Sequence, residues 1–342
     1  MAFEQLTERE RQVFLSIVQT FIESAEPVGS RYLSKYTDLN LSPATIRNVM
    51  MDLEDKGYLA QPHTSAGRVP TDSGYRLYVD GMMEGAHLTN AEKKQVYEQL
   101  ALFTRDLDAI VEHASLVLSD ISQQLGVVLA PRFQKGKIEK IELVPLADDK
   151  VLFVLSITAG LVKTVIVEIN PDIPASVIGA VSQLLNERLY GLSVGEQFAD
   201  FDERFRDLDE KIKSVLQTLK GKTEKLVTCE PSADIYMAGT RTMLKHPEYA
   251  SREKVGAILN LIDRRDILMR VLSEHAQEGV SIVIGEENKE ELMKHCSVIT
   301  TTYHVQDTVG TIGIIGPTRM PYEKIIGLVK FMSETLGYLI GR

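Results

Sequence analysis

Residues 42–57 read SPATIRNVMMDLEDKG and predict a short helix with marked ends. Ser42 suits the N-cap, and Pro43 suits the first helical position, where a backbone N–H is not needed. Apolar side chains then recur at helical spacing and predict one buried face. They are Ile46, Val49, Met50 and Leu53. Gly57 suits the left-handed position that often ends a helix. The opposite face of this helix is left free for another role.

Two more predicted helices precede this one, and a hairpin follows it. The first helix ends before Pro27, because the residue preceding a proline avoids the α region. The second helix fits residues 29–36, and residues 58–71 are typical of a hairpin with a polar tip. Three short helices and a hairpin form the element order of a winged helix-turn-helix domain, which we expect at residues 1–85.

The exposed face of the helix after Ser42 presents side chains that can contact DNA bases. At about 100° per residue, that face carries Ala44, Asn48 and Met51, and Thr45 and Arg47 flank it. Asparagine can bond adenine, arginine can bond guanine, and the methyl groups of alanine or threonine can touch thymine. The first turn, capped by Ser42, offers free N–H groups to a phosphate. The candidate DNA contacts of this helix are therefore Ser42, Ala44, Thr45, Arg47 and Asn48.

Further candidate contacts with the DNA backbone lie outside this helix. They are Arg31 and Lys35 on the preceding helix and His63, Ser65 and Arg68 on the hairpin. Phosphate contacts of this kind position a protein on the duplex. The alternative is a helical domain that only packs or dimerises, because the helix-turn-helix pattern by itself fits many proteins.

The charge of the chain excludes one class of nucleic-acid binder. The 342 residues carry a net charge of −10, and residues 1–85 hold 8 Lys and Arg against 12 Asp and Glu. A protein that coats DNA by bulk electrostatics is expected to be basic. Residues 30–48, however, hold three cations against Asp38 alone. A small basic face in an acidic domain would leave binding dependent on base readout.

Several segments resemble the heat-inducible transcription repressor HrcA family. They are residues 27–31 (PVGSR), 42–48 (SPATIRN), 62–71 (PHTSAGRVPT), 74–79 (GYRLYV), 284–287 (IGEE) and 310–320 (GTIGIIGPTRM). The run at 62–71 is the most specific, and the resemblance covers essentially the whole chain. It implies a homodimer that binds the inverted-repeat CIRCE operator upstream of chaperone operons, represses them and depends on the GroE chaperonin.

The same resemblance implies an α+β fold of several domains. It comprises an N-terminal winged helix, a GAF-like α/β domain and a dimerisation segment inserted into the GAF-like domain. We expect the winged helix at 1–85, a linker at 86–104, the GAF-like domain at 105–190 and 256–342, and the insert at 191–255.

Beyond residue 104 the hydrophobic pattern predicts a mixture of helices and strands. Helices fit residues 107–125, 174–190, 201–219, 252–277 and 321–340. Strands fit residues 138–145, 151–158, 162–169, 225–229, 235–238, 281–284, 298–304 and 308–315. Asp148 and Asp149 form a tight-turn signal, so the first two strands are expected to be antiparallel.

Two features resemble chemical sites but are explained more simply by structure. Gly310, Gly313 and Gly316 lie inside an apolar strand, so a strand packed against another backbone is favoured over a nucleotide loop. His295 and Cys296 lack the spacing of a metal or nucleophile site. We therefore expect no enzyme activity, no metal and no cofactor.

The remaining expectations concern compartment and ligand. The sequence has no apolar run of membrane-spanning length, its first residues have no signal-peptide character, and its two cysteines fit a reducing compartment. We expect a bacterial cytoplasmic protein that joins the nucleoid when bound to its operator. The alternative function is a metabolite-responsive winged-helix regulator. The apolar strands between residues 151 and 169 offer few polar groups to orient such a ligand.

Overall fold

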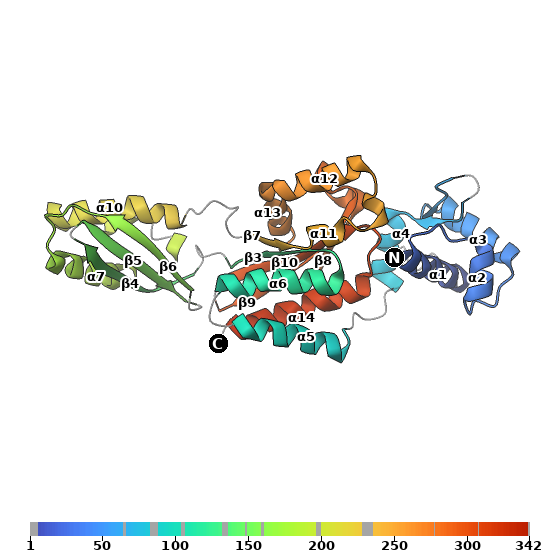
Figure 1. Cartoon of the computed structure of the whole chain (residues 1–342), viewed down its shortest axis with the longest axis horizontal. Helices are drawn as coiled ribbons and strands as arrows, with labels where there is room; N and C mark the ends of the chain where they lie inside the picture. The colour runs from blue at the N-terminus through green and yellow to red at the C-terminus, as the bar shows by residue number, and fades with distance from the viewer. Residues whose placement is uncertain are drawn as a thin grey trace.

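A computed structural model describes residues 6–63, 66–82, 88–103, 107–131, 136–147, 149–158, 161–195, 200–227, 235–276, 278–306 and 308–340. The chain is a mixed α+β protein with three parts, which we call the head (residues 6–82), the body (88–131 and 235–340) and the insert (136–227). The head and the insert lie at opposite ends of the body (Figure 1).

The head contains the three helices and the hairpin that the sequence predicts. The helices are α1 (Glu8–Ser24), α2 (Ser30–Tyr36) and α3 (Pro43–Asp55). Strands β1 (Leu59–Ala60) and β2 (Val69–Pro70) pair antiparallel. Helix α4 (Asp72–Leu77) and the π-helical turn η2 (Tyr78–Met82) follow the hairpin. Phe14, Ile17, Leu33, Ile46 and Leu53 are fully buried in this part and belong to a hydrophobic core that continues into the body.

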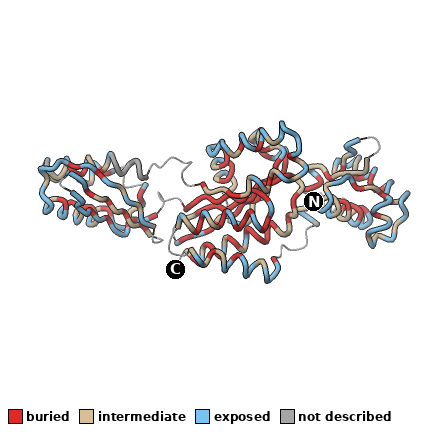
Figure 2. Tube along the Cα trace, viewed as in Figure 1, coloured by how far each residue is buried: buried red, intermediate tan, exposed pale blue. Residues whose placement is uncertain are grey.

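The body is built around a five-stranded antiparallel sheet with the strand order β7-β3-β10-β9-β8. Its strands are β3 (Leu125–Leu129), β7 (Ile235–Ala238), β8 (Ser281–Ile284), β9 (Cys296–Val305) and β10 (Thr308–Pro317). One face is covered by α5 (Asn90–Leu100), α6 (Leu107–Ser122) and α14 (Tyr322–Ile340). Over the other face lie α11 (Thr240–Met243), α12 (Arg252–Asp263) and α13 (Arg265–Glu274). Buried residues run through the sheet between these two layers (Figure 2).

Short 3-10 turns complete the body. They are η3 (Ala101–Phe103), η6 (Pro247–Tyr249), η7 (Gly285–Glu287) and η8 (Glu291–Met293). Turn η7 continues directly from β8, on the side of the body where the head is attached.

The insert is a separate three-stranded antiparallel sheet with two long helices. Its strands are β4 (Ile138–Ala147), β5 (Lys150–Ile157) and β6 (Leu161–Glu168), in the order β4-β5-β6. Helices α7 (Ala175–Leu189) and α10 (Glu210–Val227) pack on the sheet, with the short α9 (Phe201–Arg204) between them in sequence. The opposite face of the sheet carries Val144, Leu152 and Ile166 in one cross-strand row. Val144 is 41% and Ile166 57% exposed, so this face is open and partly apolar.

The insert is larger than expected and begins earlier. We expected the strands at 138–169 in the GAF-like domain and the insert at 191–255. Strands β4 to β6 pair only with one another, so this segment starts near residue 136 and its last described helix ends at Val227. From residue 235 the chain is back in the five-stranded sheet.

Other corrections concern single elements. Residues 125–129 form a buried strand, where we expected the end of a helix. The strand expected at 225–229 is wrong over residues 225–227, which end α10, and its last two residues lie outside the described chain. The helix expected at 252–277 is two helices that meet at Arg264.

The glycines of β10 lie in a strand, as predicted, but they make room mainly for side chains. A Cβ atom on Gly310 would lie 2.2 Å from the Tyr303 ring, and one on Gly313 would lie 2.6 Å from a Leu272 methyl carbon. The expected close approach is therefore to packed side chains rather than to another backbone.

Candidate nucleic-acid interface

Helix α3 forms as its sequence predicts. The Ser42 hydroxyl accepts a hydrogen bond from the Thr45 N–H at 3.1 Å and caps the helix. Its apolar face is buried: Ile46, Val49, Met50 and Leu53. Ala44, Arg47 and Asn48 are exposed, whereas Thr45 is half-buried and its hydroxyl lies 2.9 Å from that of Ser42. The polar face of α3 is therefore available to a partner.

An open groove of about 550 Å³ runs between α2, α3 and the hairpin. Arg31, near the start of α2, and Arg47, on α3, both line it. Gln61 and Gly67 line it from the hairpin. The fold thus gathers three of the predicted cations on one surface: Arg31, Arg47 and, from the hairpin, Arg68. Lys35 lies one turn further along α2 and is also exposed.

Ion pairs distinguish two groups of three among the eight Lys and Arg residues of the head. The paired group is Lys56 with Glu10, Arg68 with Glu54 and Arg76 with Glu287. Arg31, Lys35 and Arg47 are exposed, and within the described residues they have no carboxylate at ion-pair distance. A cation without an internal partner is free to neutralise a phosphate. The structure therefore separates three of the predicted cations from those that hold the head together.

The Glu10–Lys56 pair joins the start of α1 to the end of α3. The Lys56 Nζ lies 2.7 Å from the Glu10 Oε1. Burial alone would raise the pKa of Glu10, but hydrogen bonds from Lys56 and Thr7 hold the pKa below its ordinary value. This pair therefore acts within the fold of the head.

Arg68 also lines this groove, but its guanidinium is paired with a carboxylate of the head. Its Nε and Nη2 atoms lie 2.8 and 2.7 Å from the Glu54 Oε2, and its side chain is only 16% exposed. Its backbone exchanges two hydrogen bonds of 2.9 Å with Val28, just before α2. A Cβ atom on Gly67 would lie 2.2 Å from the Val28 carbonyl oxygen, so the two chains approach closely here. Arg68 thus anchors the hairpin to α3 and to the start of α2.

At the tip of the hairpin, His63 is exposed. Ser65, the other predicted contact at the tip, lies outside the described residues. His63 is therefore the described tip residue that remains accessible to a partner.

Sequence reasoning placed Met51 on the exposed face of α3 but overlooked two exposed tyrosines nearby. Tyr32 and Tyr36 are 49% and 64% exposed, and their ring centroids lie 4.9 Å apart. The Lys35 Nζ lies 5.0 Å from the centre of the Tyr36 ring. Met51 is 50% exposed and lines the groove beside Arg47. The four-residue spacing of the tyrosines was the available signal, since such residues are neighbours on a helix.

The structure offers little support for other chemistry in the described residues. They contain no group of three His, Cys, Asp or Glu side chains that could hold a metal ion. Burial raises the pKa of Cys296 to about 11, so this thiol stays protonated near neutral pH. In the part of the chain that is described, no helix combines the length and the apolar character needed to cross a bilayer.

Comparison with known proteins gives consistent matches over the whole chain. Residues 108–326 match the family model described as "HrcA protein C terminal domain". A protein of Chlorobium phaeobacteroides (strain BS1), named Heat-inducible transcription repressor HrcA, is 38% identical over 99% of this chain and 99% of its own length. A protein of the same name from Acetivibrio thermocellus is 36% identical over 97% of this chain and 95% of its own length.

One solved structure shares the fold. It is described as the crystal structure of a hypothetical protein, with a TM-score of 0.65 and 22% identity over 98% of this chain and 99% of that one. The full-length relatives define the chain as a transcription repressor. It belongs to the heat-inducible transcription repressor HrcA family.

Proposed function

We propose that the chain is a sequence-specific DNA-binding repressor of chaperone operons and that its head is a winged helix-turn-helix domain. Helix α3 is then the recognition helix, and the β1–β2 hairpin is the wing. The distribution of ion pairs carries this proposal. Cations that stabilise the head are neutralised by carboxylates, while Arg31, Lys35 and Arg47 remain free around the exposed face of α3.

The contacts divide into two kinds. In the major groove, Arg47 and Asn48 bond base edges, and Ala44 and Thr45 lie beside them on α3. The phosphates are bound by residues of α2 and of the first turn of α3, and His63 is the contact that the wing makes with DNA. The residues on the phosphates are Arg31, Lys35 and Ser42. Arg68 positions the wing through Glu54 rather than binding DNA.

We further propose that the chain acts as a homodimer through the insert. The open sheet face with Val144, Leu152 and Ile166 would be covered by the same face of a second copy. A two-fold dimer presents two recognition helices and therefore requires an inverted repeat. On this proposal, the inverted repeat is the CIRCE operator.

The body is proposed to be a GAF-like domain with a structural role. It has an antiparallel sheet with helices on both faces. Two cavities in and beside it measure about 210 and 220 Å³. Ligand sites usually have volumes of about 300–1,000 Å³. Both of these cavities in the described residues are smaller than that.

The test is a fluorescence-anisotropy titration with a duplex that contains the CIRCE inverted repeat. A duplex with scrambled half-sites is the control. We expect at least about a thousandfold tighter binding to the operator. Equal affinity for both duplexes would refute the proposal. The dependence on GroE predicts that added chaperonin raises the fraction of chain that binds and leaves the dissociation constant of the active dimer unchanged.

A further inference from the structure

Three segments that resemble the family have no part in DNA contact, yet they meet where the head joins the body. They lie in residues 74–79, 284–287 and 310–320. We propose that they form a polar latch that fixes the pose of the head on the body and thereby sets the half-site spacing that the dimer accepts. This inference rests on the proposed function, because it concerns how two heads share one operator.

The first contact of the latch is made by Arg76 of α4. Its Nε and Nη2 atoms donate to the two carboxylate oxygens of Glu287 at 2.8 and 2.5 Å. The same Nη2 donates to the carbonyl oxygen of Ile282 in β8 at 2.7 Å. Glu287 also accepts a hydrogen bond from the Ile284 N–H at 2.8 Å. A two-pronged arginine–carboxylate pair fixes direction as well as distance, so α4 cannot rotate freely on the body.

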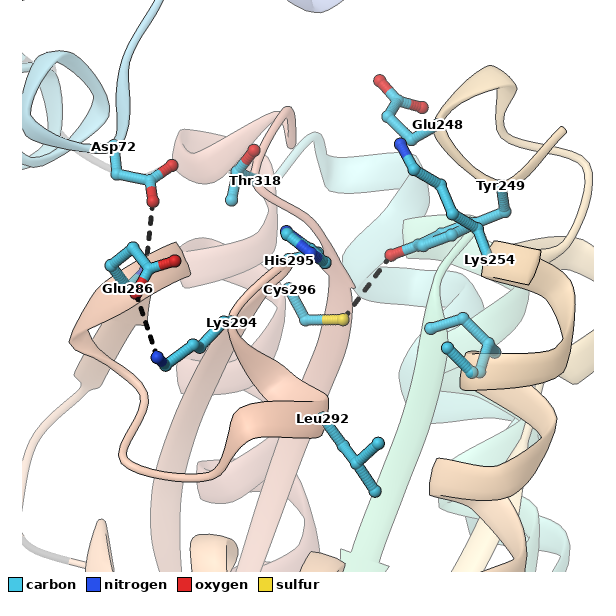
Figure 3. A pocket seen from close by; sticks show the side chains of 12 residues that line it. Asp72, Glu248, Tyr249, Lys254, Glu286, Leu292, Lys294, His295, Cys296 and Thr318 are labelled. Carbon is cyan, nitrogen blue, oxygen red and sulfur yellow. Dashed lines mark hydrogen bonds and ion pairs between the residues drawn. The ribbon is translucent and has the colours of Figure 1, made fainter. Parts of the chain in front are cut away.

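The second contact joins the start of α4 to the turn η7. The Asp72 Oδ2 accepts a hydrogen bond from the Glu286 N–H at 3.0 Å, beside the cavity of about 210 Å³ shown in Figure 3. A Cβ atom on Gly285 would lie 1.9 Å from the same Asp72 oxygen, and Gly285 has a φ of 53°. Only glycine has both the small size and the backbone freedom that this position requires. The backbone of η7 is therefore shaped to receive the head.

The third contact joins the body to the first helix of the head. Arg319, which follows β10, donates to the carbonyl oxygen of Ile22 near the end of α1 at 2.5 Å. The same guanidinium forms two hydrogen bonds with Glu248 of the body. Arg319 is only 11% exposed, so it is held in place from both sides. A cation at the carboxyl end of a helix is also favoured by the helix dipole.

Two further pairs of side chains join the head to the body. The rings of Tyr75 in α4 and Tyr322 in α14 have centroids 5.8 Å apart. The Tyr78 hydroxyl donates to Glu323 at 3.1 Å. The head is therefore bonded to the body from α1, α4 and η2, which restricts its rotation on the body. In a dimer, the body then dictates the distance and angle between the two recognition helices.

The test uses the full chain and operators in which the spacer between half-sites is lengthened by 1 to 5 base pairs. The test variant is Glu287→Gln, which keeps the shape of the side chain and removes its charge. The matched control is Asp80→Asn, because Asp80 also pairs with Arg76, at 3.2 Å, but belongs to the head. Thermal unfolding confirms that each variant is folded.

We expect Glu287→Gln to bind the natural spacing about tenfold more weakly and to lose most of its discrimination against altered spacing. Its affinity for a single half-site should equal that of the parent, and Asp80→Asn should behave like the parent. If the contact between Arg76 and Glu287 only stabilised the fold, its loss would weaken binding by the same factor at every spacing. If Glu287→Gln keeps the spacing preference of the parent, the latch is refuted.

A measurement without DNA separates this inference from the proposed function. Nitroxide labels on cysteines introduced at Asp38 in the head and Glu334 in the body, with Cys229 replaced by serine, report the pose of the head by pulsed EPR. The labelled chain is diluted with unlabelled chain. We expect one narrow distance distribution for the parent and a broad one for Glu287→Gln. Equal widths would overturn the latch, whereas failure of the parent to prefer an inverted repeat would overturn only the DNA assignment.

Discussion

Replacing Arg31 and Arg68 by methionine, one at a time, should separate a cation that binds DNA from a cation that holds the head together. Arg31 is exposed, lines the groove and has no carboxylate at ion-pair distance in the described part of the chain. Arg68 is largely buried, and both of its bonding nitrogens are directed at Glu54. Methionine removes the charge and keeps an unbranched side chain, so the two variants differ mainly in the partner that is lost.

The salt dependence of operator binding distinguishes the two roles. Each phosphate that a cation neutralises contributes about −0.9 to the slope of log affinity against log salt. A dimer carries Arg31 twice, so Arg31→Met should reduce the slope by about 1.8. When salt is raised from about 50 to 200 mM, operator affinity falls for both proteins. The factor by which it falls is then about twelvefold smaller for the variant than for the parent.

Arg68→Met should leave the slope unchanged, because Glu54 already neutralises that charge. It should instead lower the free energy of unfolding of the head by about 1–2 kcal/mol, a typical value for charge-assisted hydrogen bonds with a partly exposed partner. The assay is anisotropy of a labelled operator at several salt concentrations, together with urea unfolding. If Arg68→Met flattens the slope as much as Arg31→Met, then Arg68 binds a phosphate and the assignment of its role is wrong.

Three other perturbations test separate parts of the molecule. Asn48→Ala should weaken operator binding by roughly 1–3 kcal/mol and relax selectivity at one base pair. The measurement uses operators that carry single base-pair substitutions. Binding equal to that of the parent would show that Asn48 does not contact DNA. Ile166→Asp should weaken self-association in sedimentation equilibrium, because it places a charge on the open sheet face; an unchanged association constant would exclude that face. Hydrogen bonds from Lys324 and Thr89 lower the pKa of Glu92 to about 2, from an ordinary value of 4.5. Because the folded pKa is the lower one, this stabilisation is complete above about pH 4.5 and is lost toward pH 2, so Glu92→Gln should flatten the unfolding free energy over that window.

The recognition helix could be predicted because its signals are local. The Ser42 cap, the proline after it and the spacing of the buried residues all act within a few turns of one helix, and the structure confirms each of them. The exposed positions of Arg47 and Asn48 follow from the same periodicity. Because these signals are local, distant residues have little influence on where the helix begins, where it ends and which face it buries.

The limits of the insert could not be predicted, because strand pairing is not local. The pattern located the strands of residues 138–169, but no single strand indicates whether it pairs with β3 or with its neighbours in sequence. Strand β3 was missed for a related reason. All five residues from Leu125 to Leu129 are buried, and a short apolar run fits a buried strand and a buried helix equally well.

The role of Arg68 depends on a partner in another element. Glu54 lies 14 residues earlier, on α3, and nothing in the hairpin sequence indicates that the two side chains meet. Sequence alone therefore assigned Arg68 to DNA together with Arg31. The difference between them arises from tertiary contacts. Tertiary contacts also distinguish the latch residues Arg76 and Arg319 from the other arginines.

The arrangement of charge explains how an acidic head can bind DNA selectively. Glu10 and Glu54 cancel Lys56 and Arg68 inside the head, which leaves three free cations near α3 on each copy of the chain. So few phosphate contacts give weak attraction to DNA of arbitrary sequence and weak binding to one half-site. Useful affinity then requires both heads to bind at once, and the gain from the second head depends on geometry that permits it. The polar latch therefore affects operator affinity itself, because it decides whether the second recognition helix reaches its half-site without strain.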